Sequence, residues 1–415
     1  MLMNLVFHTL PNGIRLVHQP SASEVAHCGV IIDAGSRDEQ PDEHGMAHFI
    51  EHMLFKGTGK RKPYHILSRL EDVGGELNAY TTKEETAIHA SFLKEHYARA
   101  IELISDLLFS STLPASEIEK EKEVVIEEIS SYLDNPAEYI FDEFEEMVFP
   151  GQPIGRNILG KPETVRAITR TRLQQFIRKN YSTDKMVFCS VGAVEPQKLI
   201  SLFEKYFSKI PERRGDKRAK CKYLYKPVVR EKKMDTFQNH CIIGNTAFDL
   251  HNEKRINLFL LNNILGGQAQ NSRLNLSLRE RRGYAYNVES MYNPYTDTGL
   301  IAIYFGTDSH NLQKSIDLTL SELNTLRTRA LGTLQISKAR SQIKGYLARA
   351  WENHESLMLS LGKSLLVFNK IEGMAEIFRK IDSVTSSDLL ETANIIFNKD
   401  LLSTLIYKKN GERPR

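Results

Sequence analysis

The chain of 415 residues contains few cysteines and no paired-cysteine motif. Its four cysteines are widely spaced, and none forms a C-x-x-C pair: Cys28, Cys189, Cys221 and Cys241. This spacing is typical of free thiols in a reducing compartment, and it argues against a disulfide framework or a cysteine-ligated zinc cluster.

Long apolar runs and a large charge of one sign are also absent. No apolar run reaches the roughly 18 residues that a membrane span needs. The first twenty residues have no charged start followed by a long apolar stretch, and they predict two short strands around the turn Pro11–Gly13. We therefore expect a cytoplasmic protein without a membrane segment. The formal net charge of +3 is small for this length, so bulk charge does not predict nucleic-acid binding.

Length and composition indicate two globular domains. An apolar fraction of 41% and a charged fraction of 26% are those of an ordinary globular protein, and the chain is too long for one core. The stretch Pro211–Lys220 is basic and lacks apolar periodicity, which favours a solvated linker over a nucleic-acid patch. We predict a first domain at 1–211, a basic linker at 212–230 and a second domain at 231–415.

The second half repeats the order of elements in the first half. In each half a helix ends at a glycine, and a glycine-to-strand junction follows about 20 residues later, Gly57 then Gly75 and Gly266 then Gly283. This pattern indicates a diverged duplication. At the place of the motif described next, the second half has the apolar run Leu258–Leu265, so we expect no metal there.

The pentapeptide His48–His52 reads H-x-x-E-H, which is a zinc-hydrolase signature in inverted order. On a helix, two histidines four residues apart lie on one face and can bind one metal ion. Glu51 projects from nearly the same face and can reach a metal-bound water without being a ligand. Zinc lowers the pKa of such a water, and a nearby carboxylate can accept its proton and transfer it to a leaving amine.

A third ligand must come from elsewhere in the chain. His44 lies one turn before His48, but three imidazoles at this spacing spread along about 12 Å of helix, which suits a tetrahedral ion poorly. The predicted helix Ala115–Leu133 offers glutamates near a buried side that we expect to be formed by Val124, Val125, Ile129 and Leu133. Periodicity alone leaves both Glu127 and Glu128 as candidates. Glu121 lies two turns before Glu128 and suits a carboxylate that orients a histidine.

The chain resembles the pitrilysin/insulinase family of zinc peptidases over nearly its whole length, in particular members of the processing-peptidase β-subunit type and short bacterial homologues. The resemblance is carried by the segments HGMAHFIEHMLFKGT, GGELNAYTTKEET, EKEVVIEEI and LGGQAQNSRLNLSLRERRGYAYNVES. It implies an α+β fold of two duplicated α/β domains, each a mostly antiparallel sheet flanked by helices. It also implies one zinc ion per chain.

The resemblance implies roles for further residues. The family's third zinc ligand is a glutamate 76 residues after the second histidine, which selects Glu128, with Glu121 as the matching upstream carboxylate. An Arg and a Tyr seven residues apart, which bind substrate and stabilise the tetrahedral intermediate, match Arg279 and Tyr286.

Substrate-binding positions are implied as well. The strand Glu76–Thr81 matches an edge strand to which an extended peptide is added, with Asn78, Ala79 and Tyr80 beside the scissile bond. Glu138 and Asp142 match acidic positions that hold a basic substrate residue.

The predicted function is therefore that of a zinc-dependent endopeptidase acting on peptides or unfolded segments. An inactive metal-binding subunit of a larger assembly, or a non-proteolytic zinc hydrolase, is the alternative. Because the chain carries both the zinc motif and the Arg–Tyr pair, we expect a homodimer in which each active site is completed in trans by the other protomer.

Overall fold

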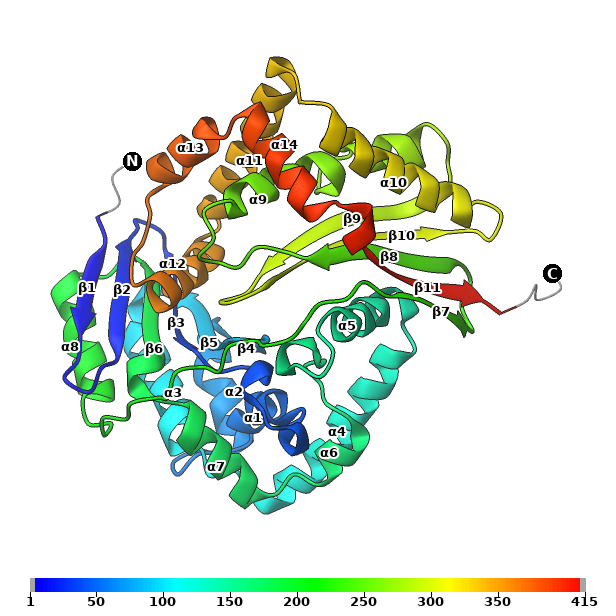
Figure 1. Cartoon of the computed structure of the whole chain (residues 1–415). Coiled ribbons are helices and arrows are strands. Elements are labelled where there is room, and N and C mark those ends of the chain that lie inside the picture. The colour runs from blue at the N-terminus through cyan, green and yellow to red at the C-terminus, as the bar shows by residue number, and fades with distance from the viewer. Residues whose placement is uncertain (1–3, 411–415) are drawn as a thin grey trace. The chain divides into compact units, whose positions relative to one another are not determined.

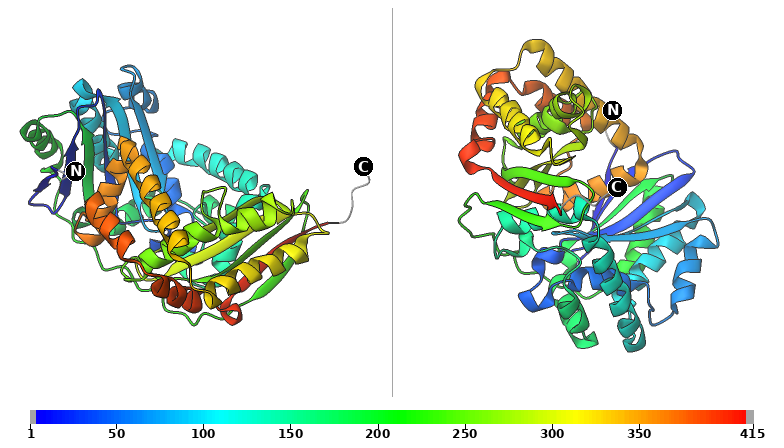
Figure 2. Two further views of the ribbon diagram at one scale, coloured as in Figure 1. Left: turned by 90° about the horizontal axis from the view of Figure 1, so that it is seen from above. Right: turned by 90° about the vertical axis from the view of Figure 1, so that its right-hand side faces the viewer.

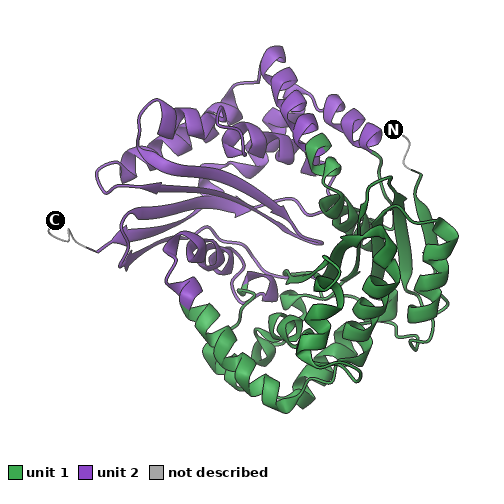
Figure 3. Ribbon diagram, turned by 180° about the vertical axis from the view of Figure 1, so that it is seen from behind, with its two compact units in different colours: residues 1–130, 156–219, 348–373 green, residues 131–155, 220–347, 374–415 purple. Residues whose placement is uncertain are grey.

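The computed structural model describes residues 4–410 and divides the chain into two compact units (Figures 1 and 3). Unit 1 contains the residues up to 130, 156–219 and 348–373. Unit 2 contains residues 131–155, 220–347 and 374 onward. The predicted domains at 1–211 and 231–415 are continuous stretches of the chain, whereas each unit contains three separate stretches. The domain bounds stay a prediction.

Unit 1 is built on a six-stranded sheet with the order β1-β2-β6-β3-β5-β4. Its strands are β1 (Val6–Thr9), β2 (Arg15–Pro20), β3 (Val25–Ile32), β4 (Glu76–Thr81), β5 (Thr86–Leu93) and β6 (Met186–Gly192). Only β2 and β6 run parallel, and the other neighbours are antiparallel. The two short strands expected around Pro11–Gly13 are β1 and β2. Strand β4 pairs only with β5, so it is an edge strand.

Helices cover both faces of the first sheet (Figure 2). They are α1 (Met46–Leu54), α2 (Pro63–Glu71), α3 (Tyr97–Ser110), α4 (Ala115–Leu133, up to Ser130 in this unit), α6 (Pro162–Arg166), α7 (Arg170–Asn180), α8 (Pro196–Phe207) and α12 (His354–Phe368). Residues of α1 and α3 pack into the large core on one face, for example Phe49 and Ile104. Met358 and Leu361 of α12 pack with Ile31 and Val187 on the other face.

Unit 2 has a five-stranded sheet with the order β7-β11-β8-β10-β9. Its strands are β7 (Val229–Met234), β8 (Asn239–Thr246), β9 (Ala285–Pro294), β10 (Gly299–Thr307) and β11 (Ser403–Lys409). Its helical elements are α5 (Pro136–Val148), α9 (Arg255–Gly266), the π-helical turn η6 (Asn275–Glu280), α10 (Leu312–Thr328), α11 (Thr333–Glu352, up to Leu347 in this unit), α13 (Met374–Ser383) and α14 (Ser386–Ile396). Only β7 and β11 run parallel.

The two sheets have the same plan, which confirms the predicted fold of two duplicated, mostly antiparallel sheets flanked by helices. Reading from the parallel pair to the free edge, β2-β6-β3-β5-β4 corresponds to β7-β11-β8-β10-β9. The correspondence includes an exchange of helices. Helix α5 from the first half packs on β8 and β11 of unit 2, whereas α12 from the second half packs on β3 and β6 of unit 1.

The helix that carries the H-x-x-E-H motif begins at Met46, because Pro41–Glu43 forms a 3₁₀ turn, η2, and Gly45 adopts a φ of 94°. That left-handed backbone is open to glycine, and a Cβ there would approach the carbonyl oxygen of Leu159 to 2.7 Å. Helix α4 has the predicted bounds. Among the described residues, no helix is both long and apolar enough to cross a membrane.

Candidate metal centre

Helix α1 carries the H-x-x-E-H motif on the side away from its core contacts. Phe49, Ile50 and Met53 are fully buried, whereas His52 keeps 21% of its side chain exposed. The carboxylate of Glu39 accepts hydrogen bonds from the backbone N–H groups of Gly45 (3.1 Å) and Ala47 (2.8 Å). These bonds satisfy donors at the start of the helix, which otherwise have no partner within it.

Helix α4 brings glutamates to the motif. Val125 and Ile129 are buried, as expected, but the expectation was wrong for Val124 and Leu133, which are 49% and 42% exposed. The buried stripe of the helix is narrower than its apolar content suggests, and Glu121, at 5% exposure, takes part in it. The close polar partners of Glu121 explain why a carboxylate can be buried there.

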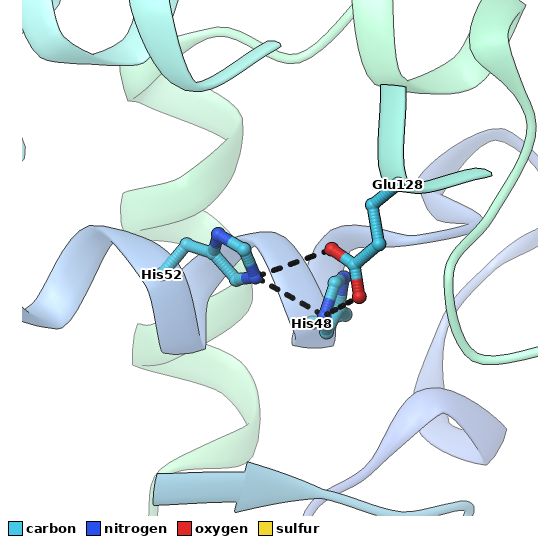
Figure 4. A group of neighbouring side chains, drawn as sticks. All are labelled: His48, His52 and Glu128. Carbon is cyan, nitrogen blue, oxygen red and sulfur yellow. Dashed lines mark hydrogen bonds and ion pairs between the residues drawn. The ribbon is translucent and has the colours of Figure 1, made fainter. Parts of the chain in front are cut away.

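The structure brings together the donor atoms of His48, His52 and Glu128 (Figure 4). The Nε2 atoms of the two histidines lie 3.2 Å apart. The Glu128 carboxylate oxygens lie 3.7 Å from Nε2 of His48 and 3.7 Å from Nε2 of His52. Within residues 4–410 this is the one group of three or more His, Cys, Asp or Glu residues with ligand atoms so close.

These spacings fit a tetrahedral zinc ion. At zinc–ligand distances of about 2.0–2.1 Å and tetrahedral angles, two ligand atoms lie about 3.3–3.4 Å apart. The observed separations of 3.2 and 3.7 Å are close to that value. Two nitrogens and one carboxylate also form the donor set of zinc sites that keep a fourth position open.

A chain of polar contacts through Glu121 to Lys56 holds the Nδ1 side of the His52 ring. Its Nδ1 lies 2.9 Å from Oε1 of Glu121, and Nζ of Lys56 lies 2.7 Å from the other oxygen of the same carboxylate. Nδ1 therefore donates to Glu121, and Nε2 is left with its lone pair directed toward His48 and Glu128. A carboxylate in this position fixes the orientation of a metal-binding histidine.

The electrostatics of His48 and of Glu121 suit metal binding at neutral pH. Burial, with a smaller contribution from the neighbouring His52, lowers the pKa of His48 to about 4, so this imidazole is neutral with a free lone pair. For Glu121, burial acts to raise the pKa, but hydrogen bonds from His52 and Lys56 outweigh it and lower the pKa. Glu121 is therefore an anion.

Glu51 lies one residue before His52 on the same helix and is half-buried. Burial raises the pKa of its carboxyl group, and the Glu128 carboxylate adds to this, while Thr81 and His52 act in the opposite direction. A carboxylate with a raised pKa is a stronger base than a solvated one.

The two alternative ligands are placed elsewhere. Nε2 of His44 lies 2.9 Å from the carbonyl oxygen and 3.1 Å from Oδ1 of Asn157, so this ring is engaged outside the group. Glu127 is exposed and does not belong to the group.

Asn78, Ala79 and Tyr80 lie on the edge strand β4, which contacts α1. Ala79 packs in the same core as α1, while Tyr80 packs with α12 on the other face. The Tyr80 hydroxyl donates a hydrogen bond of 3.2 Å to Glu85, and the side chain of Asn78 is exposed. The unpaired side of β4 offers backbone groups for an added strand.

Arg279 and Tyr286 lie in unit 2, and both stand on irregular backbone. Arg279 belongs to the π-helical turn η6, with half of its side chain exposed. In β9, Ala285 pairs with Thr307 and Asn287 with Gly306, so Tyr286 is the extra residue of a β-bulge and is 83% exposed. Such turns and bulges direct side chains outward from regular elements and are common at functional sites.

Glu138 and Asp142 lie on α5, also in unit 2. Both are near the hydroxyl of Tyr132, which donates a hydrogen bond of 3.3 Å to the carbonyl oxygen of Glu138. Burial raises the pKa of Tyr132, and hydrogen bonding to Asp142 raises it further. Both residues therefore lie near Tyr132, and their spacing of four residues places them on one side of α5.

Comparison with known proteins identifies the family. The model of the insulinase family (peptidase family M16) matches residues 15–162, and the model of the peptidase M16 inactive domain matches residues 167–343. The uncharacterized zinc protease YmxG of Bacillus subtilis is 32% identical over 98% of this chain and 99% of its own length. The chain belongs to peptidase family M16.

Other M16 relatives and solved structures agree with this assignment. The mitochondrial-processing peptidase subunit beta of Saccharomyces cerevisiae is 30% identical over 93% of this chain and 87% of its own length. The crystal structure of a protease from Helicobacter pylori has a TM-score of 0.89 with 21% identity, and it covers 98% of this chain and 100% of its own. A peptidase M16 inactive domain from Pseudomonas fluorescens has a TM-score of 0.91 with 17% identity, over 99% of both chains. These two structures support the fold.

Membership of family M16 confirms the resemblance seen in the sequence. The expected zinc cofactor is confirmed as well, because relatives are named zinc proteases and this chain has a His–His–Glu group able to hold the ion.

Sequence reasoning missed two residues that support the M16 metal group. Lys56, four residues after His52, holds the Glu121 carboxylate, and its spacing was a usable signal. Glu39, which caps α1, lies nine residues before His48, and no periodic pattern connects a loop residue to a helix start.

Proposed function

We propose that this chain is a zinc-dependent endopeptidase in which His48, His52 and Glu128 hold the ion. The observation that supports this most directly is the approach of three donor atoms to within 4.8 Å of one another, on helices that also carry Glu51 and Glu121. When bound, zinc lowers the pKa of a water molecule and polarises a carbonyl group.

The protein's own residues would then perform the proton transfers. Glu51 takes a proton at its carboxylate from the attacking water and passes it to the nitrogen of the leaving amine. Its raised pKa makes it able to do both. Glu121 keeps His52 in the orientation and tautomer that a ligand needs.

We propose that the substrate binds as an extended strand along β4. The free edge of this strand offers backbone hydrogen bonds, which do not depend on side chains, and Asn78, Ala79 and Tyr80 would lie beside the scissile bond. Peptides and unfolded segments can adopt such a strand, whereas folded proteins present few free strands.

Arg279 and Tyr286 are proposed to bind substrate and to stabilise the charge that develops on the carbonyl oxygen. A guanidinium and a phenol both donate hydrogen bonds to an oxyanion. Glu138 and Asp142 are proposed to favour a basic substrate residue, because two neighbouring carboxylates attract a guanidinium.

The central test is peptide cleavage by the purified chain, with and without a chelator, and by Glu51→Gln. With a mixed peptide library we expect cleavage that the chelator abolishes and that Glu51→Gln lowers by roughly 10²–10⁴-fold, the usual contribution of a general base. Zinc content should stay unchanged in the variant, since Glu51 is not a ligand. Cleavage that survives in both arms contradicts the mechanism, and a zinc-loaded wild-type chain that cleaves nothing indicates an inactive subunit.

The ligand assignment has its own test. Glu128→Gln should lose zinc on dialysis, whereas Glu127→Gln, one residue away and exposed, should keep it. Full zinc occupancy in Glu128→Gln, measured by metal analysis, would contradict the assignment.

We further propose a homodimer in which Arg279 and Tyr286 act on the site of the other protomer. Mixing Glu51→Gln chains with Arg279→Ala/Tyr286→Phe chains, each inactive alone, should restore part of the activity, because one of the two sites in a mixed dimer is intact. No recovery despite subunit exchange seen by native mass spectrometry would refute this arrangement. A different partner chain is the second candidate, favoured by the word "subunit" in the name of the yeast relative.

A further inference from the structure

The connector that leaves unit 1 ends in a buried arginine. Residues 211–219 form no helix or strand, and most of them are exposed, as expected for a linker. Arg218 is different, because its side chain is 11% exposed, compared with 83% for Arg214 in the same segment. The interpretation of this stretch as wholly solvated was therefore wrong at Arg218.

Arg218 bonds to three acidic residues of unit 1. Its Nε and Nη2 atoms donate to the two carboxylate oxygens of Asp38, both at 2.8 Å, which is a bidentate pair. Its Nη1 lies 2.8 Å from Oδ1 of Asp33. Its Nη2 also donates to the backbone carbonyl oxygen of Glu84 at 2.8 Å. Charge-assisted, bidentate bonds of this kind are the strong ones in proteins.

The partners of Arg218 belong to two segments that already pair with each other. Asp38 ends η1 (Ser36–Asp38), in the loop that leads into the metal helix α1, and Glu84 lies in the turn between β4 and β5. Backbone N–H groups of Ser36 and Arg37 donate to the carbonyl oxygens of Thr82 and Lys83, at 3.1 and 2.8 Å. Arg218 therefore spans the junction between the loop before α1 and the turn that ends β4.

Arg37 strengthens the same junction. Its Nη1 lies 2.5 Å from Oε1 of Glu84, and its Nη2 donates to the carbonyl oxygen of Ala219 at 3.4 Å. The connector is thus held through both a side chain, Arg218, and a backbone carbonyl, Ala219.

A second arginine at a unit boundary holds the same loop. Arg156 is the first residue of unit 1 after the chain returns from unit 2. It donates to the carbonyl oxygens of Glu39 at 2.7 Å and Gln40 at 2.9 Å, and its own carbonyl oxygen accepts from Lys83. At two of the places where the chain passes between the units, next to Arg156 and Arg218, it is therefore hydrogen-bonded to the segments that flank α1 and β4.

We propose that Arg218 is a positioning residue of the peptidase, which ties the connector to the β4–β5 turn and so keeps the substrate strand β4 in place beside α1. This inference rests on the proposed role of β4 in binding substrate. The residue has to be arginine, because a lysine ammonium cannot make a bidentate pair with Asp38 while also bonding to a second acceptor in the same plane.

The test compares Arg218→Met and Arg218→Lys with the matched control Arg214→Met. Arg214 lies four residues away in the same connector, and its side chain forms an ion pair with the exposed Glu212. In Arg218→Met we expect amide hydrogen exchange in residues 76–93 to become about tenfold faster or more, since the charge-assisted bonds that hold the β4–β5 turn are lost. We expect KM for peptides to rise by a similar factor with zinc content unchanged, a smaller effect in Arg218→Lys, and no effect in Arg214→Met.

Two further measurements keep the outcomes distinct. If Arg218→Met fails to fold, Asp38→Asn weakens the same bidentate pair with a smaller change of charge, and the exchange measurement is repeated there. Exchange in 76–93 that matches wild type in folded variants overturns the proposal, even if cleavage depends on zinc and Glu51. If exchange accelerates in the variant but the wild-type chain cleaves no peptide, Arg218 stabilises the β4–β5 turn. In that case the proposed function fails, and a positioning role in catalysis is overturned.

Discussion

The two units share one strand order, but only one of them carries a metal group. After the third strand of the shared plan, unit 1 has α1 with His48, Glu51 and His52, and unit 2 has α9 with the buried Leu258, Leu261 and Leu265. Both helices pack well on their sheets. The scaffold therefore needs no metal to form its core, and the residues that face away from the sheet can carry metal-binding side chains in one unit and not in the other.

The largest expected effect concerns unit 2, and it tests whether this unit takes part in catalysis. If Arg279 and Tyr286 stabilise the developing oxyanion, Arg279→Met or Tyr286→Phe should lower kcat by about 10²–10³-fold, the usual cost of losing such a donor. Zinc content should stay at the wild-type level, because neither residue belongs to the metal group. Arg281→Met, an exposed neighbour, is the matched control. Unchanged turnover would show that unit 2 contributes only scaffold at these positions.

A smaller effect is expected from the residue that supports a ligand within unit 1. Glu121→Gln should lower zinc affinity by about 10–100-fold, because its carboxylate orients His52. Glu123→Gln, on the exposed side of the same helix, should have no effect. Competition with a chromogenic chelator measures both affinities. Equal affinities for the two variants would mean that His52 is held by packing alone.

Substrate preference should change modestly when α5 loses its acidic pair. Glu138→Gln/Asp142→Asn should reduce the preference for Arg or Lys near the cleaved bond by about two- to fivefold, which corresponds to the usual strength of partly exposed ion pairs. Cleavage-site profiling of a peptide library gives this ratio. A wild-type profile without basic enrichment would refute the assignment before any variant is made.

The smallest predicted effect is a pH dependence of stability at the cap of α1. Burial raises the pKa of Glu39 to about 8, against the two N–H bonds that it accepts. In the unfolded chain the same group titrates near 4.5. The folded state therefore holds one more proton between these values, and stability falls as the pH rises from about 5 to 8.

Glu39→Gln resembles the protonated cap and should lack this dependence. We expect the difference in Tm between wild type and Glu39→Gln to shift in favour of the variant as the pH rises from 5 to 8. Glu123→Gln, at an exposed glutamate of α4, serves as the control. A difference that stays constant over this range would contradict the raised pKa.

Much of the fold and of the metal group could be predicted from the sequence. The H-x-x-E-H spacing predicts two histidines on one face correctly because α1 is a regular helix. Helix α4 has the predicted bounds because its amphipathic stripe and the following Asn135–Pro136 are local signals. The choice of Glu128 over Glu127 required the family resemblance, since both lie beside the buried stripe. Periodicity placed Val124 and Leu133 in that stripe, yet both are exposed, because burial depends on what packs against a helix.

Long-range contacts could not be predicted. Nothing in the basic stretch 211–220 distinguishes Arg218 from Arg214, because the partners of Arg218 lie about 130 to 180 residues earlier in the chain. No sequence pattern predicts the bulge at Tyr286 or the π-helical turn at Arg279, since each depends on the register of a neighbouring element.

The exchange of α5 and α12 has a consequence for how the molecule is made. One face of the first sheet stays uncovered until residues 354–368 have been synthesised, long after the last strand of that sheet, β6, is complete. During synthesis on a ribosome, apolar surface of the amino-terminal half therefore stays exposed to solvent, and chaperones can bind it. Contacts between segments so distant in the chain also slow folding. For the same reason, a gene fragment that ends in the connector would encode a first half without α12, the helix that covers one face of its sheet. We expect the two halves to fold only when both are present.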